Sequence, residues 1–136
     1  MLITRTRTAT MTAFGAAVAA SLLIAGPASA DPALSVTPST GLSDGQSVTV
    51  TGSGFTAGTD VSITECSSPT LCSATTVTAT VGADGTFSAP YAVSKTFEGH
   101  DWSSGTTVTV DCAATQCLVS AWEQGAGTRT QTISFS

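Results

Sequence analysis

The sequence predicts an all-β protein, a two-sheet antiparallel sandwich of about seven to nine short strands. Apolar and polar residues alternate with a period of two along most of the chain, as in strands with one buried face. Turn residues separate these segments, and no segment carries a convincing helical period. The 106 residues from Asp31 onward include 21 Thr and 16 Ser, which suit half-exposed strands and turns respectively.

The expected strands are marked, in chain order, by apolar residues that share one face. They are Leu34 and Val36; Val48 and Val50; Val61 and Ile63; Val77, Ala79 and Val81; Phe87, Ala89, Tyr91 and Val93; Val108, Val110 and Cys112; and Ile133 with Phe135. Turn signals fall between them at residues 38–41, 44–45, 57–58, 84–85 and 125–127. No linker interrupts the series, so we expect one domain spanning residues 31–136.

A further strand is expected after the fourth cysteine, and its register is ambiguous. Its two faces carry Val119 with Ala121, and Leu118 with Ser120 and Trp122. If the first pair faces the core, a large apolar pair stands on the opposite side, which is an informative kind of exposure. Periodicity alone favours neither register.

Residues 1–30 have the three-part layout of a secretory signal peptide. Two arginines precede an apolar stretch at about residues 13–25, and small residues at 28–30 precede a cleavage site. The apolar stretch is too short to cross a bilayer as a helix, which takes about 20 residues. We therefore expect cleavage after Ala30, secretion of the mature chain and no membrane association.

The mature chain is strongly acidic. It keeps two cations, Lys95 and Arg129, against nine carboxylates, so its formal charge is 2 − 9 = −7. Such a surface repels DNA phosphates and anionic lipid headgroups. The composition therefore argues against a protein that binds nucleic acid directly.

Four cysteines in an exported chain are expected to form disulfides, and four allow three pairings. Two short local loops, Cys66 with Cys72 and Cys112 with Cys117, are the simplest pairing. The inter-sheet alternative, Cys66 with Cys112, lacks the buried Trp that normally packs on it in immunoglobulin domains. A zinc site is disfavoured because the chain has no C-x-x-C pair and a single His.

The sequence offers little that could catalyse a reaction. His100 next to Asp101, with many serines elsewhere, is the one combination that could be assembled into a nucleophilic triad. A lone His in such a setting is more often an exposed loop residue, and solvation explains Glu98 and Asp101 better than paired acid–base chemistry. The sequence contains no metal motif and no phosphate-binding glycine loop. We predict that the protein is not an enzyme.

Several segments, taken together, resemble the neocarzinostatin family of antibiotic apoproteins. They are residues 36–45 (VTPSTGLSDG), 52–59 (GSGFTAGT), 83–85 (ADG), 96–99 (TFEG), 110–112 (VDC) with Cys117, and 133–135 (ISF). The ordered set spans nearly the whole mature chain, with all four cysteines in register. The resemblance implies a seven-stranded immunoglobulin-like sandwich, the two local disulfides and no catalytic machinery.

The resemblance also implies a function. Several members of this family of small, acidic, secreted proteins bind an enediyne chromophore non-covalently, protect it and release it to cut DNA. By this comparison the protein is a monomeric carrier of a small apolar ligand, and it reaches DNA only through the released ligand. The alternative is a secreted immunoglobulin-like binding or structural module without an enediyne, since fold alone does not fix function.

A ligand cleft is the third implication. The predicted ligand-binding residues are Trp102, Trp122, Leu118, Ser120, Thr76, Val77, Cys66 and Cys72. The tryptophans would supply stacking faces, the first disulfide would form the floor, and Thr76 or Val77 aligns with a second aromatic position of the family. Leu118 and Trp122 replace a polar and a small residue of the family, so Trp122 either stacks on a different ligand or fills the cleft.

Overall fold

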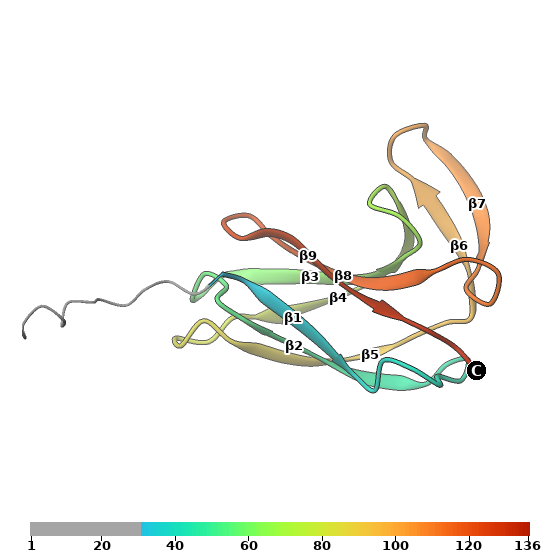
Figure 1. The fold of residues 1–136 in the computed structure, drawn as a ribbon. Helices are drawn as coiled ribbons and strands as arrows, with labels where there is room; N and C mark the ends of the chain where they lie inside the picture. The colour runs from blue at the N-terminus through green and yellow to red at the C-terminus, as the bar shows by residue number, and fades with distance from the viewer. Residues whose placement is uncertain (1–30) are drawn as a thin grey trace, which may run out of the picture.

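The structure, a computed structural model, describes residues 31–136, which form an all-β molecule with no helix among them (Figure 1). The strands are β1 (Ala33–Thr37), β2 (Ser47–Ser53), β3 (Asp60–Cys66), β4 (Leu71–Thr80), β5 (Phe87–Ala92), β6 (Thr96–Asp101), β7 (Thr106–Asp111), β8 (Cys117–Glu123) and β9 (Gly127–Ile133). The predicted fold class is confirmed. The expected signal peptide lies outside the described residues, and within 31–136 no helix could cross a membrane.

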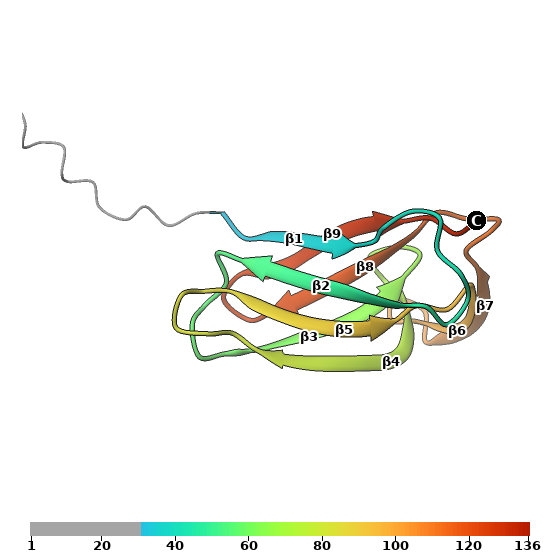
Figure 2. The same cartoon turned by 90° about the horizontal axis from the view of Figure 1, so that it is seen from below.

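The strands pair as two antiparallel sheets, ordered β1-β2-β5 and β7-β6-β4-β3-β8-β9. Three strands of the first sheet and four of the second, β4, β3, β8 and β9, face each other as a sandwich (Figures 1 and 2). The remaining two, β6 and β7, form a hairpin that joins β4 through only three residue pairs. Figure 1 shows this hairpin extending away from the sandwich. The seven strands that the resemblance implies are therefore the sandwich itself, and the hairpin adds two more.

The core lies between the two sheets because alternate residues of each strand point inward. In β2 the burial pattern alternates without a break, which places Val48 and Val50 inside. Val61 and Ile63 meet them from β3 of the facing sheet, and both are fully buried. Each such side chain contributes roughly 1.5–3 kcal/mol through removal of apolar surface from water. Period-two patterning therefore predicts these strands correctly, whereas it marks β9 only by its last residue, Ile133.

Both disulfides are local, as the spacing favoured. Cys66 bonds to Cys72 and Cys112 bonds to Cys117, with sequence separations of 6 and 5 residues. No free cysteine remains in the described part of the chain. The first disulfide closes the turn between β3 and β4, and the second closes the turn between β7 and β8.

The prediction that Val108 shares a buried face with Val110 and Cys112 is wrong. Val108 is 45% exposed, whereas the other two are buried. Val108 pairs with Gly99 in the part of the hairpin that extends beyond the sandwich, where no second sheet covers it. Apolar and polar residues continue to alternate in β7, but the facing sheet that would bury the apolar side chains does not extend over Val108.

Candidate functional site

Strand β8 separates the core from the candidate site. Val119 and Ala121 are fully buried in the core, whereas Leu118 is half-buried and Trp122 is 52% exposed on the other face. Ser120 lies on that same face but is only 9% exposed. Of the two registers that periodicity allowed, the structure has the one that turns Trp122 outward.

Cross-strand pairing then defines the outer face, the side of the β4-β3-β8-β9 sheet that points away from the core. Its residues are Asp60, Ser62, Thr64, Cys66, Cys72, Thr76, Thr78, Thr80, Leu118, Ser120, Trp122, Thr128, Thr130 and Thr132. Residues directly opposite one another in antiparallel strands share a face. Trp122 accordingly stands between Ser62 of β3 and Thr128 of β9, and Ser120 stands between Thr64 and Thr130.

Only one of the two alternatives on β4 belongs to this face. Thr76 pairs with Thr64 and is exposed beside it. Val77 pairs with Ile63 and packs against the core from the opposite side of the sheet. The outer face therefore gathers Thr76, but not Val77, with the predicted residues of β8.

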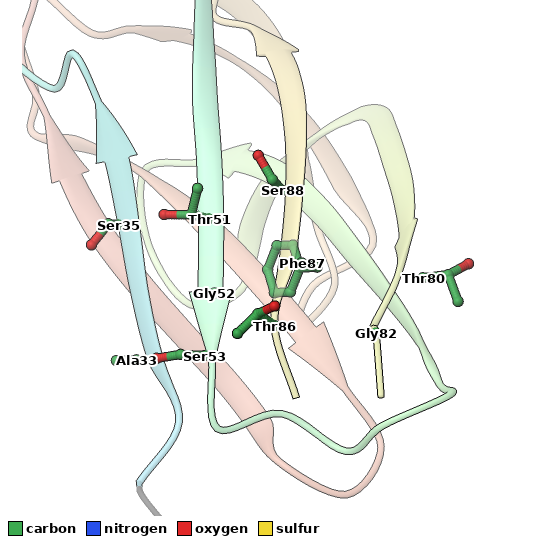
Figure 3. A pocket seen from close by; sticks show the side chains of 10 residues that line it. All are labelled: Ala33, Ser35, Thr51, Gly52, Ser53, Thr80, Gly82, Thr86, Phe87 and Ser88. Atoms are coloured by element: carbon green, nitrogen blue, oxygen red, sulfur yellow. The ribbon is translucent and has the colours of Figure 1, made fainter. Parts of the chain in front are cut away.

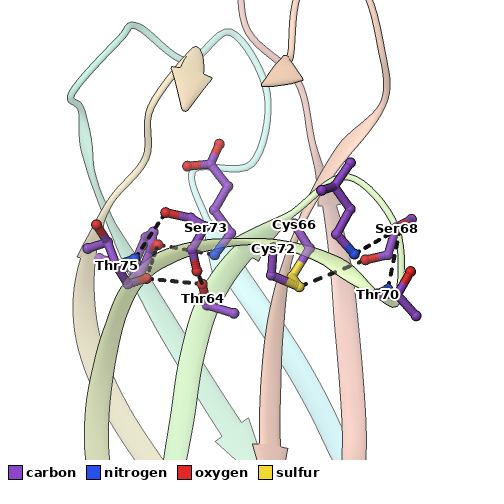
Figure 4. Close-up of a disulfide and its surroundings, with 10 residues drawn as sticks. Thr64, Cys66, Ser68, Thr70, Cys72, Ser73 and Thr75 are labelled. Atoms are coloured by element: carbon purple, nitrogen blue, oxygen red, sulfur yellow. Dashed lines mark hydrogen bonds between the residues drawn. A yellow bond between two sulfur atoms is a disulfide. The ribbon is translucent and has the colours of Figure 1, made fainter. Parts of the chain in front are cut away.

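The first disulfide lies at one end of the outer face (Figure 4). Cys66 pairs with Leu118 of β8, and Cys72 pairs with His100 of β6, so the disulfide lies between the sandwich and the hairpin. Ser68 tightens the intervening turn, because its Oγ accepts hydrogen bonds from the amides of Thr70 and Leu71 at 3.3 and 3.1 Å. A short side chain at position 68 thus holds the turn closed.

Trp102 lies at the tip of the hairpin, and its surroundings fix its backbone. Its amide donates to the Thr70 carbonyl at 2.9 Å, which ties the tip to the disulfide turn. Its indole is 68% exposed and meets the His100 ring edge-on, with ring centroids 4.5 Å apart. Such a T-shaped pair is a favourable aromatic arrangement. His100 and Trp102 therefore form one aromatic unit on the hairpin.

Gly99 allows the hairpin to pack this closely. A Cβ at position 99 would lie 2.9 Å from Cδ1 of Leu71 and 3.0 Å from Cγ2 of Val110. Cβ atoms essentially never come within 3.0 Å of another heavy atom, so a larger residue at position 99 would require the Leu71 side chain to move. Gly99 thus lets the Leu71 and Val110 side chains pack directly against the β6 backbone.

The acidic residues of the hairpin shape its turn. Oδ1 of Asp101 accepts hydrogen bonds from the hydroxyl and the amide of Ser103, at 2.6 and 2.9 Å. These bonds, the hydroxyl first, lower the pKa of Asp101 from its ordinary value. Oε2 of Glu98 accepts from the Thr109 hydroxyl at 2.8 Å. The carboxylates thus have structural partners, and the His100 ring contacts Trp102 instead.

A second cluster lies inside the molecule, where the buried carboxylate of Glu65 is close to Cys112 and Cys117. The two sulfur atoms are bonded to each other and supply no thiolate for a metal ion. Oε1 of Glu65 accepts a hydrogen bond from the Ser94 amide at 2.8 Å. Burial raises the pKa of Glu65 to about 7, although the Ser94 bond acts in the opposite direction.

Two hollows of the described residues lie elsewhere, and the first meets the outer face only at Thr80. One, of about 620 Å³, is lined by β1, β2 and β5 residues such as Ser35, Thr51, Phe87 and Ser88, on the three-stranded sheet (Figure 3). The other, of about 360 Å³, lies between the Cys112–Gln116 segment and the C-terminus. Neither includes a predicted ligand-binding residue.

Comparison with known proteins decides the family. A sequence model described as the neocarzinostatin family matches residues 34–136. The chain belongs to the neocarzinostatin family. It is 37% identical over 120 residues to the antitumor antibiotic C-1027 apoprotein of Streptomyces globisporus, covering 82% of this chain and 84% of that protein. Macromomycin of Streptomyces macromomyceticus is 36% identical over 127 residues, covering 88% of both chains.

Solved structures of the neocarzinostatin family also match the fold. Macromomycin superposes with a TM-score of 0.70 at 32% identity, covering 77% of this chain and 99% of that one. Apokedarcidin superposes with a TM-score of 0.61 at 29% identity, covering 79% of this chain and 100% of that one. The family resemblance inferred from the sequence is therefore confirmed.

Residues that the sequence did not single out as ligand-binding also lie at the candidate site. His100 packs on Trp102, and Ser62 and Thr128 flank Trp122. The spacing of His100 and Trp102 in an expected strand could have placed both on one face. The neighbours of Trp122 come from other strands, and their positions depend on a cross-strand register that a single sequence does not encode locally.

Proposed function

We propose that the protein is a secreted, non-enzymatic carrier that binds a small, apolar, enediyne-type chromophore and protects it. One observation carries the proposal: a chain of the neocarzinostatin family bears two exposed indoles, Trp102 and Trp122, beside one sheet face. Large apolar side chains with this much exposure, held by regular strands and a bonded turn, are typical of a binding surface.

The proposed site lies between the hairpin and β8. Trp102 and His100 present aromatic surface from one side, Leu118 and Trp122 from the other, and the Cys66–Cys72 disulfide lies between them. A flat apolar ligand gains from burial of its surface and from ring stacking, each stacked pair adding roughly 0.5–1.5 kcal/mol. The arrangement suits retention of such a molecule without a covalent bond.

DNA enters this function only indirectly. The chain carries seven more negative than positive charges from Asp31 onward, so the protein itself is repelled by DNA. Under the proposal the released chromophore attacks DNA. Residues 1–30 direct the chain out of the cell, and the mature protein begins at Asp31, which the intact mass of the secreted protein would establish.

A fluorescence titration tests the carrier function. A neutral polycyclic aromatic compound should quench tryptophan emission saturably at micromolar concentration, and Trp102→Ala should weaken binding about tenfold. Thr51→Ala, on the other sheet, is the matched control and should bind as the parent does. Absence of quenching at micromolar ligand would refute the proposal, and tighter binding by Trp122→Ala would show that Trp122 obstructs the site.

The alternative, an immunoglobulin-like module without a chromophore, predicts a different result for the native protein. Solvent extraction of protein purified from its producing organism should yield a compound that absorbs at wavelengths above the tryptophan band. A colourless extract from freshly secreted protein would favour the alternative.

A further inference from the structure

The outer face is uncharged over almost its whole extent. Its Ser and Thr side chains come from four neighbouring strands, and Asp60 at one end is its one charged member. The rest of the molecule is strongly acidic, with seven more carboxylates than cations from residue 31 onward. A ligand recognised by this face therefore has no charge to match, but it meets many hydroxyl groups.

Trp122 stands among these hydroxyls. Its neighbours across the strands are Ser62 and Thr128, and Thr78 lies next to Ser62 in the same row. None of the side-chain hydroxyls of these three residues takes part in a hydrogen bond within the described residues. Each therefore offers a donor and acceptor beside an indole that is 52% exposed.

Ser120 adds an independent observation. Its side chain is nine-tenths buried, two residues from Trp122 on the same face, yet its hydroxyl has no hydrogen-bond partner within residues 31–136. Buried polar groups in folded proteins nearly always have a partner, and an unpartnered one is costly. A ligand hydroxyl above Ser120 would supply the missing partner.

We propose that the Trp122 end of the outer face binds a neutral pyranose ring. The C–H bonds on one side of such a ring form a flat, slightly positive surface that stacks on the electron-rich face of an indole. The ring hydroxyls meanwhile reach Ser120, Ser62 and Thr128, so both features of the face are used. A plain polycyclic aromatic compound would use only the indole.

This inference rests on the proposed function in one respect only: part of the carried ligand would lie on the outer face. The pyranose ring has two sources: a sugar attached to a small carried molecule, or the units of a neutral polysaccharide outside the cell. The two are distinguished by size, because a surface that takes one or two rings binds soluble glycosides, whereas retention on an insoluble polymer requires several units along the strands.

The outer side of the other sheet provides an internal control. Ser35, Thr51 and Ser88 form a comparable row of hydroxyls there, but the lining of that face contains no tryptophan. If hydroxyl groups alone bound saccharides, both sheets would respond. If the indole is required, only the Trp122 side responds.

The experiment is a titration of the mature protein followed by the NMR signals of the two indole N–H groups. The probes are methyl β-glucoside and cellotetraose. The Trp122 signal should shift saturably at millimolar sugar, whereas the Trp102 signal should move at least fivefold less. Trp122→Ala should weaken binding at least tenfold, Trp122→Phe should retain part of it, and Ser120→Ala should weaken it severalfold. Thr51→Ala should leave it unchanged.

Two outcomes distinguish the sources of the sugar. If the parent, but not Trp122→Ala, is retained on insoluble cellulose, the bound ring belongs to a polysaccharide. If only soluble glycosides bind, the ring belongs to a carried molecule.

Other outcomes distinguish this inference from the proposed function. If the Trp122 signal does not shift, or if Thr51→Ala loses as much binding as Trp122→Ala, the inference is overturned, while aromatic binding still supports the carrier. Saccharide binding without aromatic binding overturns the carrier and leaves this inference standing. Near-ultraviolet circular dichroism of each variant verifies folding.

Discussion

Two buried glutamates have their pKa values moved in opposite directions by their surroundings. The carboxylate of Glu123 accepts hydrogen bonds from the Thr56 amide, the Thr59 hydroxyl and the Ala126 amide. Hydrogen bonding by the Thr56 side chain first, and then by the Ala126 and Thr56 amides, lowers its pKa to about 2. Glu65 has fewer partners and is held in a less polar place, so its pKa rises instead.

Glu123→Gln should reduce stability and flatten its dependence on acid. Because the folded pKa of about 2 lies below the ordinary value of 4.5, the parent gains stability above 4.5 and loses it as the pH falls toward 2. Urea unfolding at several pH values between 2 and 7 would measure this. Glu98→Gln, at an exposed glutamate, is the control. Parallel pH profiles for parent and Glu123→Gln would contradict the prediction.

Glu65→Gln should change the stability of the fold at high pH, whereas Glu123→Gln changes it in acid. The folded pKa of about 7 lies above the ordinary 4.5, so the protonated form stabilises the fold below 4.5 and this contribution is lost as the pH rises through 7. At pH 8 the variant should be more stable than the parent by up to about 3 kcal/mol. Thermal unfolding between pH 4 and 8 would show it. His100→Gln, which removes the one histidine of the chain, is the control and should preserve the parent's slope.

At the scale of elements, the Cys66–Cys72 disulfide connects the sandwich to the hairpin that carries Trp102. Replacing both cysteines by Ser should lower the free energy of unfolding by about 2 kcal/mol, because a short loop loses its constraint. It should also weaken binding of an aromatic ligand, since the start of β4 holds the hairpin through three residue pairs. Denaturant unfolding and the fluorescence titration measure the two effects.

The second disulfide is the matched comparison for that prediction. Cys112 and Cys117 close a loop of similar length, but their disulfide lies at the turn between β7 and β8, away from Trp102. Replacing them should cost similar stability while leaving ligand affinity close to that of the parent. Equal losses of affinity in both double variants would show that general loosening, not the hairpin attachment, is responsible.

The elements also show which structural features a single sequence encodes. Alternation identified sandwich strands where burial by a facing sheet leaves that pattern, as in Val48 and Val50, but it marked β9 only by Ile133. It could not place Val108, whose exposure depends on the hairpin leaving the sandwich. Nor could it choose the register of β8, because apolar residues occupy both faces of that strand, Val119 and Ala121 on one and Leu118 and Trp122 on the other. The family resemblance, not periodicity, predicted that Trp122 faces outward.

At the scale of the whole molecule, charge dominates any encounter with nucleic acid. The apoprotein should not bind duplex DNA even at about 10 mM salt, where attraction by any basic patch would be strongest. Gel-shift titration, with a basic protein of similar size as the positive control, would test this. Salt-sensitive binding by the ligand-free protein would contradict it.

The family resemblance predicted part of the candidate site, because it compares residues over the whole chain. The resemblance brought together residues from β3, β4, β8 and the hairpin, and the structure does place Cys66, Thr76, Leu118, Ser120 and Trp122 on one sheet face. Val77 shows the limit of such alignment, because a shift of one residue in a strand reverses the face. The structure places the hollow of about 620 Å³ on the opposite sheet, which no pattern in the sequence indicated.

Strand β8 has one further consequence, because one side of it seals the interior while the other carries residues of the candidate site. Substitutions at positions 118 and 122 can accumulate with little effect on folding, since Leu118 is half-buried and Trp122 is exposed, whereas Ser120 is buried. Ligand preference can therefore drift among descendants while thermal stability stays constant. A combinatorial library confined to codons 118 and 122 would be a practical route to retargeting this scaffold.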